Sequence, residues 1–245
     1  MIDFLLLILL EFLCERGIIN EIILPSPTNI LFESDFLNIF NSFVLTFKHV
    51  IIVFALALVL NMLIVLVIYL LDFKYLENVL YRINSIPRIL ITLIGIAILG
   101  VGYKTIGIVS IISSMPNFII TVLGYLRNNN WKSVIEAGTD CGATEFEILT
   151  LILIPSNIRG IIISIKILIS NILNSIIIGE YLIGTQGIGS SLQYNLFMYD
   201  MKNVWMIALL LAVCSVVISC MFDFILNSKM FWFQYVNIYI LNILI

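Results

Sequence analysis

The sequence has few charged residues and a weakly acidic balance. Lys, Arg, Asp and Glu together make up 11% of the 245 residues, and the net charge is −3. An ordinary soluble domain is about a quarter charged, so this chain has too little polar surface to cover a water-soluble globule. It also has no basic field of the kind that nucleic-acid binding requires. We therefore expect a membrane protein with no nucleic-acid partner.

Histidine and paired cysteines are equally scarce. The only histidine, His49, follows Lys48 at the start of an apolar run, which favours a membrane-surface position over a proton relay. The four cysteines form no CxxC pair and lie beside no histidine, so neither a zinc site nor a redox dithiol is indicated: they are Cys14, Cys141, Cys214 and Cys220. We expect no metal, no cofactor and no catalytic residues.

The sequence contains long intervals without charged residues, and 62% of all residues are hydrophobic. A helix needs roughly twenty apolar residues to cross the hydrocarbon of a bilayer. Residues 50–71, 105–126 and 203–222 meet this length without a charge, and residues 160–179 meet it with one charge, Lys166. That lysine must face a protein interior, find a partner or snorkel to a surface. Residues 89–103 and 2–13 are shorter candidates, and the latter is interrupted by Glu11.

These intervals predict an all-α integral membrane protein with about six transmembrane helices in a single domain, residues 1–245. The start of the chain has no basic region and no A-x-A site, so a retained helix is a better interpretation than a signal peptide. Residues 230–245 are expected to form an interfacial tail, with a seventh insertion as the alternative.

Basic residues set the expected orientation, because cytoplasmic loops collect Lys and Arg. With both termini inside, seven basic residues lie in cytoplasmic segments and four outside. The inner set is Lys74, Arg82, Arg88, Arg127, Lys132, Arg159 and Lys229, and the outer set is Arg16, Lys48, Lys104 and Lys202. We therefore expect a multi-pass protein with a cytoplasmic N-terminus.

The long loop from Arg127 to Arg159 is polar but keeps a helical pattern. Small or apolar residues recur every three or four positions and predict one stripe: Val134, Ala137, Cys141, Thr144 and Ile148. Gly138 and Gly142 would each cost about 1 kcal/mol inside a helix, which indicates a sharp bend or a close approach of a partner. An ordinary amphipathic loop is the alternative, but a face of this kind is suited to lie in the groove of another protein.

This loop resembles the EAA motif of ABC importer permeases. Glu136-Ala137 is followed by Gly142 five positions after the alanine and then by Ile154-Pro155. Further segments are similar to other elements of that family, in its nitrate, sulfonate and taurine branch: Leu24-Pro25-Ser26-Pro27, Ile86-Pro87, Gly179-Glu180-Tyr181 and Gly184-Thr185-Gln186-Gly187-Ile188-Gly189. The resemblance covers about residues 11–223, with its core at about 40–226. Gly138, Ile154 and Lys166 depart from the family pattern, which has alanine, leucine and arginine at these positions.

The resemblance implies a type I importer-like permease in a bacterial plasma membrane. Its cytoplasmic coupling helix would contact a separate ATP-binding subunit through Glu136, Ala137, Gly138, Gly142 and Ala143, with Pro155 ending the element. It also implies an extracytoplasmic substrate-binding protein and a permease homodimer within the lipid bilayer.

The chain itself has no P-loop. In the nearest sequence, Gly100-Val101-Gly102-Tyr103-Lys104-Thr105, a tyrosine separates glycine from lysine, so ATP hydrolysis is expected in the partner.

Lys166 and Glu180 are the ionisable residues predicted to lie within the membrane, and such residues are candidates for a transport pathway. Glu180 could instead form a cap or a hydrogen bond near the outer surface. Gly184, Gly187 and Gly189 are expected to shape a tight outer turn beside the pathway. A membrane-embedded enzyme and a structural membrane protein remain as alternatives. Neither requires the loop from Arg127 to Pro155, and an enzyme would need clusters of catalytic side chains.

Overall fold

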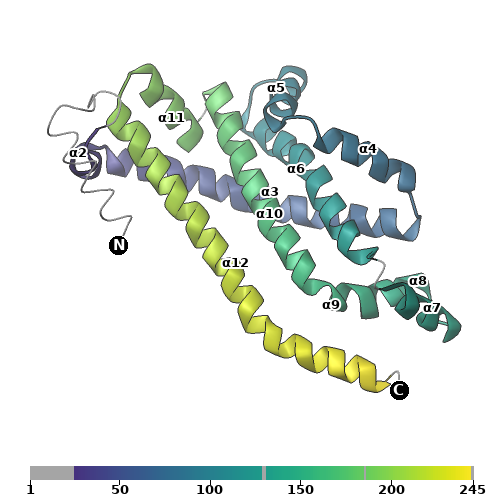
Figure 1. Ribbon diagram of the computed structural model, residues 1–245. Coiled ribbons are helices and arrows are strands. Elements are labelled where there is room, and N and C mark those ends of the chain that lie inside the picture. Colours follow the sequence, from purple (N-terminus) through teal and green to yellow (C-terminus); the bar gives the residue numbers. More distant parts are fainter. Residues whose placement is uncertain (1–24, 129–130, 185, 244–245) are drawn as a thin grey trace.

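The computed structural model describes residues 25–128, 131–184 and 186–243, and every regular element in this part of the chain is a helix (Figure 1). Two short helices, α2 (Pro27–Glu33) and α11 (Ile188–Phe197), lie at one end of the long helices. The loop predicted to be functional lies at the other end. The predicted first span, residues 2–13, lies outside the described residues.

Four helices are long and apolar enough to cross a membrane: α3 (Phe36–Leu70), α6 (Tyr103–Leu126), α10 (Ile158–Ile183) and the first part of α12 (Met201–Ile243). They contain the four strongest predicted spans. The first begins 14 residues earlier than its charge-free interval, because Lys48 and His49 continue the helix. His49 is buried against the ring of Tyr103, with ring centroids 3.7 Å apart. Its location at the level of the membrane surface stays a prediction. The tail predicted from residue 230 continues α12 as far as Ile243.

The shorter predicted span, residues 89–103, corresponds to one half of a broken helix. Helices α4 (Lys74–Asn84) and α5 (Arg88–Leu99) are bent by 99° and together qualify as a fifth candidate span. Pro87 stands at the N-cap of α5, where it cannot donate a backbone hydrogen bond to α4. We had predicted a cytoplasmic loop over α4 because of its charges. In the structure the extra length of this candidate span comes from α4 rather than from residues beyond 99, and the cytoplasmic position of the α4 charges stays a prediction.

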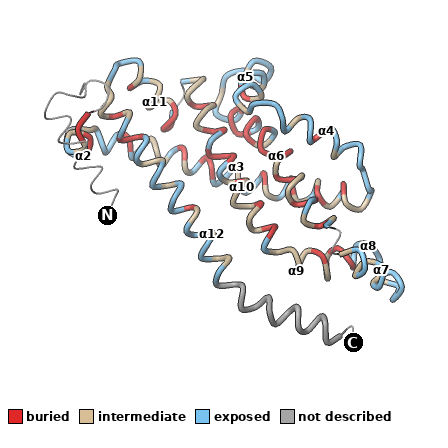
Figure 2. Tube along the Cα trace, in the orientation of Figure 1, coloured by how far each residue is buried: buried red, intermediate tan, exposed pale blue. Residues whose placement is uncertain are grey.

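Helices α6 and α10 form the centre of the bundle. In their most apolar windows 61% and 50% of the residues are buried, against 28% in α3 and 22% in α12 (Figure 2). Their contact contains fully buried Phe118, Ile119, Leu168 and Ile172. The exposed faces of α3 and α12 carry many large apolar side chains. Such surfaces suit a bilayer, where lipid rather than water surrounds the outer helices.

A smaller apolar cluster joins α2 and α11 to α3 and α12. It consists of Ile30, Ile39, Ile188, Met206 and Ile207. Helix α2 begins at Pro27, and the Ser26 side chain accepts a hydrogen bond from the Asn29 amide at 3.4 Å. Proline at the first helical position after a serine cap is a favourable start for a short helix. This cluster holds the end of the bundle on which α11 lies.

Candidate functional site

The loop between α6 and α10 folds into a chain of short helices, residues 132–156, which we call the elbow. Its elements are α7 (Lys132–Asp140), α8 (Glu145–Glu147), the π-helical segment η2 (Ile148–Leu153) and α9 (Ile154–Ser156). Glu136, Ala137 and Gly138 lie in α7, and Gly142 and Ala143 form the turn after it. Pro155 lies in α9 rather than ending the element before it. The elbow thus contains the whole predicted coupling set.

Gly142 makes the bend between α7 and α8 possible. Its φ is +84°, and a Cβ placed there would meet no heavy atom within 4 Å. The left-handed conformation is what glycine adopts without steric cost. Of the two predicted reasons for this glycine, the bend is therefore observed. The open space around it leaves room for a partner.

A capping box fixes the direction in which the chain leaves this bend. Thr144 Oγ1 accepts a hydrogen bond from the Glu147 amide at 3.3 Å, and the Glu147 carboxylate accepts one from the Thr144 amide at 2.8 Å. The N-terminal amides of Thr144 and Glu147 are both satisfied in this way. The Thr144 hydroxyl also donates to the Glu147 carboxylate, at 2.7 Å. The two bonds that this carboxylate accepts, from the backbone and the hydroxyl of Thr144, lower the pKa of Glu147 because they stabilise its charged form.

The inner face of the elbow is anchored in the core of the bundle. Ile148, Leu149 and Leu153 of η2 are buried, and Ile135 of α7 packs against the same cluster. A Cβ on Gly138 would lie 3.2 Å from the Ile148 side chain. This glycine therefore allows close packing within the chain, and its contact with a partner stays a prediction.

The outer face of the elbow is open. Helix α7 has no buried residue, and Glu136, Ala137 and Cys141 are all exposed (Figure 2). The single stripe predicted from Val134 to Ile148 is wrong, because the bend at Gly142 interrupts the helical period. Of the predicted stripe, Ala137 and Cys141 before the bend are exposed, whereas Ile148 after it is buried in the core.

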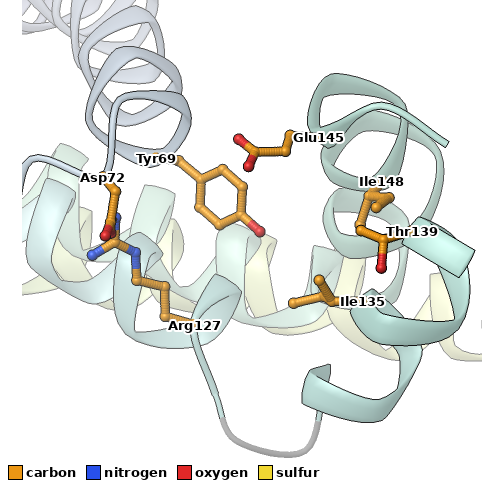
Figure 3. A pocket seen from close by; sticks show the side chains of 7 residues that line it. All are labelled: Tyr69, Asp72, Arg127, Ile135, Thr139, Glu145 and Ile148. Carbon is orange, nitrogen blue, oxygen red and sulfur yellow. The ribbon is translucent and has the colours of Figure 1, made fainter. Parts of the chain in front are cut away.

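Arg127, the C-cap of α6, ties this end of α6 to the neighbouring ends of α3 and α4. Its guanidinium forms ion pairs with Asp72, at 3.1 Å, and with Glu77, and it lies over the ring of Tyr69, 5.9 Å from the centroid. A pocket of about 290 Å³ separates α3 from the elbow (Figure 3). Its lining consists of Tyr69, Asp72, Arg127, Ile135, Thr139, Glu145 and Ile148. The elbow is thus attached through its inner face and free on its outer face.

Glu180, near the end of α10, is fully buried at the other end of the bundle. Its carboxylate accepts hydrogen bonds from the Thr46 hydroxyl, at 2.8 Å, and from the Gly189 amide, at 3.1 Å. Thr46 in turn accepts one from the Ile188 amide at 2.8 Å. The carboxylate therefore lies at the positive N-terminal end of α11 and links α3, α10 and α11. Of the two predicted roles, the geometry shows the hydrogen-bonding one, although the contact is internal rather than at a surface.

Two of the three predicted glycines, Gly187 and Gly189, lie against Glu180. A Cβ on Gly187 would collide with the Glu180 carboxylate, and one on Gly189 would lie 2.7 Å from Glu180 Cβ and collide with a backbone carbonyl of α10. Gly184 is the C-cap of α10. The turn therefore needs glycine because its backbone approaches α10 closely.

Lys166 forms an ion pair within the chain, which is one of the three arrangements predicted for a charge in this span. Its ammonium group lies 2.8 Å from a carboxylate oxygen of Asp223 on α12. Lys166 and Glu180 do not form one site, since they are 14 residues apart in α10, a distance of about 21 Å. The predicted pathway residues therefore fall into two separate places.

Three polar residues that contribute to these contacts were missed from the sequence: Thr46, Asp223 and Arg88. Arg88 was assigned to a cytoplasmic loop, yet it lies at the break between α4 and α5 and donates a hydrogen bond to Asn171 at 2.6 Å. The proline immediately before it was the available signal.

The apolar bundle and its elbow define a membrane-embedded transport permease. The family described as "Binding-protein-dependent transport system inner membrane component" matches residues 4–229, and this chain belongs to that family. The prediction of an ABC importer permease is thereby confirmed.

Relatives of known structure or name agree with this assignment. Two crystal forms of the inward-facing MetNI methionine ABC transporter contain chains similar in fold. One has a TM-score of 0.67 at 15% identity and covers 79% of this chain and 96% of its own. The other has a TM-score of 0.65 at 18% identity and covers 75% and 92%. The trimethylamine N-oxide transport system permease protein TmoV of Pelagibacter ubique (strain HTCC1062) is 27% identical over 150 residues, 61% of this chain. The matched stretch spans only 20% of that relative.

Proposed function

We propose that this chain forms the translocation pathway of an ABC importer and that its elbow docks on a separate ATP-binding subunit. The observation that carries the proposal is the contrast between the two faces of the elbow. The inner face is anchored by buried Ile148, Leu149 and Leu153, whereas no residue of α7 is buried. A helix held rigidly from behind and bare in front is suited to lie in a groove of another protein.

The elbow can transmit motion because it is braced on both sides. The capping box of Thr144 fixes its bend, and Trp131 donates a hydrogen bond to Asn157, at 3.3 Å, across the base of the elbow. Displacement of the outer face would therefore move α6 and α10 together as a rigid body. Glu136, Ala137, Gly142 and Ala143 are the residues proposed to contact the ATP-binding subunit. Gly138 and Pro155 support them from within the chain.

The surrounding assembly is also a proposal. The elbow faces the cytoplasm of a bacterial cell, the N-terminus is on the same side of the inner membrane, and the α11 end receives a substrate-binding protein outside. Two copies of the permease form a homodimer around the pathway. The large apolar surfaces of α3, α5 and α12 support burial against lipid or a second copy.

The proposed solute is small, of the sulfonate, taurine, nitrate or vitamin-precursor kind, and is selected mainly by the binding protein. Of the candidate pathway residues, Glu180, Gly184, Gly187 and Gly189 would control the outer end of the pathway through the α11 turn. Lys166 would act through its ion pair with Asp223 on α12.

Crosslinking from the native Cys141 tests the docking. Cys141 is exposed on the outer face of the elbow. We would replace the three other cysteines with serine or alanine, attach a photoreactive maleimide to Cys141 in membranes, and identify adducts by mass spectrometry. The expected adduct is with a nucleotide-hydrolysing subunit. A matched variant with its only cysteine at Phe197, which is 83% exposed at the opposite end, should give none. Equal adducts from both positions, or none from Cys141, would refute the proposal.

A further inference from the structure

Arg88 is the first residue of α5, directly after the break in the fifth candidate span. Helices α4 and α5 have 11 and 12 residues, so each is about 17 Å long. Neither can cross roughly 30 Å of hydrocarbon alone. Taken together as one candidate span, the pair has its break, and Arg88 with it, between two half-length helices. Broken helices of this kind are where transporters place their binding sites.

The contact with Asn171 fixes the depth of Arg88. Asn171 stands 13 residues after the start of α10 at Ile158 and 12 before its end at Ile183. It is thus about 20 Å from either end of this helix. Since Arg88 Nη1 lies 2.6 Å from Asn171 Oδ1, the guanidinium sits half-way along the bundle. Phosphates of lipid headgroups are about 15 Å away at this depth, beyond the reach of the arginine side chain.

The charge of Arg88 has no counter-ion among the described residues. Lys74, Arg127 and Lys166 each form an ion pair there, whereas Arg88 donates its hydrogen bond to the neutral amide of Asn171. Helices α6 and α10 pack against α5. In these two helices the only carboxylate is Glu180, about 13 Å further along α10 and bonded to Thr46. An unpaired charge within a membrane bundle is costly and is a candidate functional group by default.

A second group beside Arg88 also lacks a partner. Asn171 is 6% exposed, and its buried Nδ2 donates to no atom of the described residues. The guanidinium, this amide and the N-terminal end of α5 thus present donors and positive potential at one place. The side chains of Ile86, Ile89 and Leu90 around the break are exposed, so this place is open on one side.

We propose that Arg88, Asn171 and the start of α5 form an anion-binding site for a carboxylate, sulfonate or phosphate group of the transported solute. This inference rests on the proposed transport function and adds to it the place where an anionic group of the solute binds. A guanidinium binds such planar or tetrahedral oxyanions through two parallel hydrogen bonds, which chloride cannot reproduce. The site would hold the solute half-way through its passage.

Thermal unfolding of the full chain, with any subunits that copurify, in a neutral detergent tests this site. The probes are 20 mM sodium acetate, methanesulfonate and phosphate, each compared with sodium chloride of equal ionic strength. We expect at least one of them to raise the wild-type midpoint by about 3 °C. Arg88→Gln should lose this rise, and Arg88→Lys should keep only part of it. Arg159→Gln, the removal of an exposed charge on α10, should keep it fully.

Asn171→Asp tests the site in a chain that keeps Arg88, so the result does not depend on whether the protein folds without this arginine. It gives Arg88 an internal carboxylate, so the chain should be more stable than wild type without any probe and should no longer respond to oxyanions. The inference is overturned if no probe raises the wild-type midpoint, or if Arg88→Gln or Asn171→Asp keeps the full rise. If the Cys141 adduct with the ATP-binding subunit forms while the anion effect is absent, this inference alone fails. If that adduct is absent, the transport proposal fails whatever the anions do.

Discussion

Substitutions of Gly142 can separate its role in forming the bend from its proposed contact with the ATP-binding subunit. Its φ of +84° makes any other residue strained, at about 1 kcal/mol for alanine and less for asparagine or aspartate, which tolerate the left-handed region. A cost of 1 kcal/mol corresponds to about a five-fold change in the population of the bend. Because nothing lies within 4 Å, a side chain here meets no atom of its own chain. Bulk at this position can therefore disturb only a partner.

Two measurements on Gly142→Ala, Gly142→Asn and Gly142→Asp should consequently follow different orders. The midpoint of thermal unfolding should fall most for alanine, by about 2–4 °C, and least for asparagine. Solute uptake should fall least for alanine and be abolished by aspartate, with normal amounts of protein in the membrane. Gly100 is a matched control, since its φ is +83° and nothing lies within 4 Å of its Cβ position. The same substitutions there should change stability but not uptake.

The reasoning would be refuted if uptake followed the unfolding midpoint, so that alanine impaired transport more than asparagine. Gly142 would then be only a turn residue. Normal uptake by Gly142→Asp would equally contradict a contact with the ATP-binding subunit. An effect of the same size at Gly100 would show that the assay reports on general destabilisation.

Other contacts give further predictions. Gly189→Ala should lower the amount of folded protein, because its Cβ would collide with a carbonyl of α10; a normal unfolding midpoint would show that α11 is not packed as described. Lys166→Met should change the rate or selectivity of uptake and leave Asp223 unpaired, and Asp223→Leu in the same chain should recover part of the lost stability; unchanged uptake kinetics would leave Lys166 with a packing role only. The pKa of Glu147 is lower than its ordinary value of 4.5. The ionised carboxylate therefore stabilises the bend fully above pH 4.5, and this stabilisation is lost as the pH falls through the lowered pKa. Thr144→Ala should move the loss to higher pH, as measured by hydrogen exchange of the elbow, and an unchanged pH profile would refute the capping role.

The spans could be predicted because the cost of charge in hydrocarbon leaves a direct mark on sequence. Residues 105–126 correspond closely to α6, since its charged neighbours Lys104 and Arg127 stand at its ends. The same rule indicates a loop between spans at α4 because of its charges, whereas the structure has a helix there that qualifies, together with α5, as a candidate span. In the structure Glu77 is paired with Arg127 of another helix, and such a contact removes the penalty without any local signal.

The elbow was predictable in place but not in detail. A helical pattern combined with glycines indicated a bend near Gly142, and the bend is there. The prediction of one continuous stripe did not take this bend into account. A residue in the left-handed conformation changes the direction in which all later side chains of the segment point. The Glu180 contact could not be predicted at all, because Thr46 is 134 residues away in the chain. Only packing of α3 against α10 brings the two together.

The most direct test of the central claim is the labelling rate of Cys141 in inverted membrane vesicles, with and without the ATP-binding subunit that the crosslink identifies. The claim is that the outer face of the elbow is bare in the permease and covered in the complex. It predicts fast labelling of Cys141 by a membrane-impermeant maleimide in the permease alone, and protection of about ten-fold or more when the subunit is present. Equal rates in the two preparations would contradict the claim.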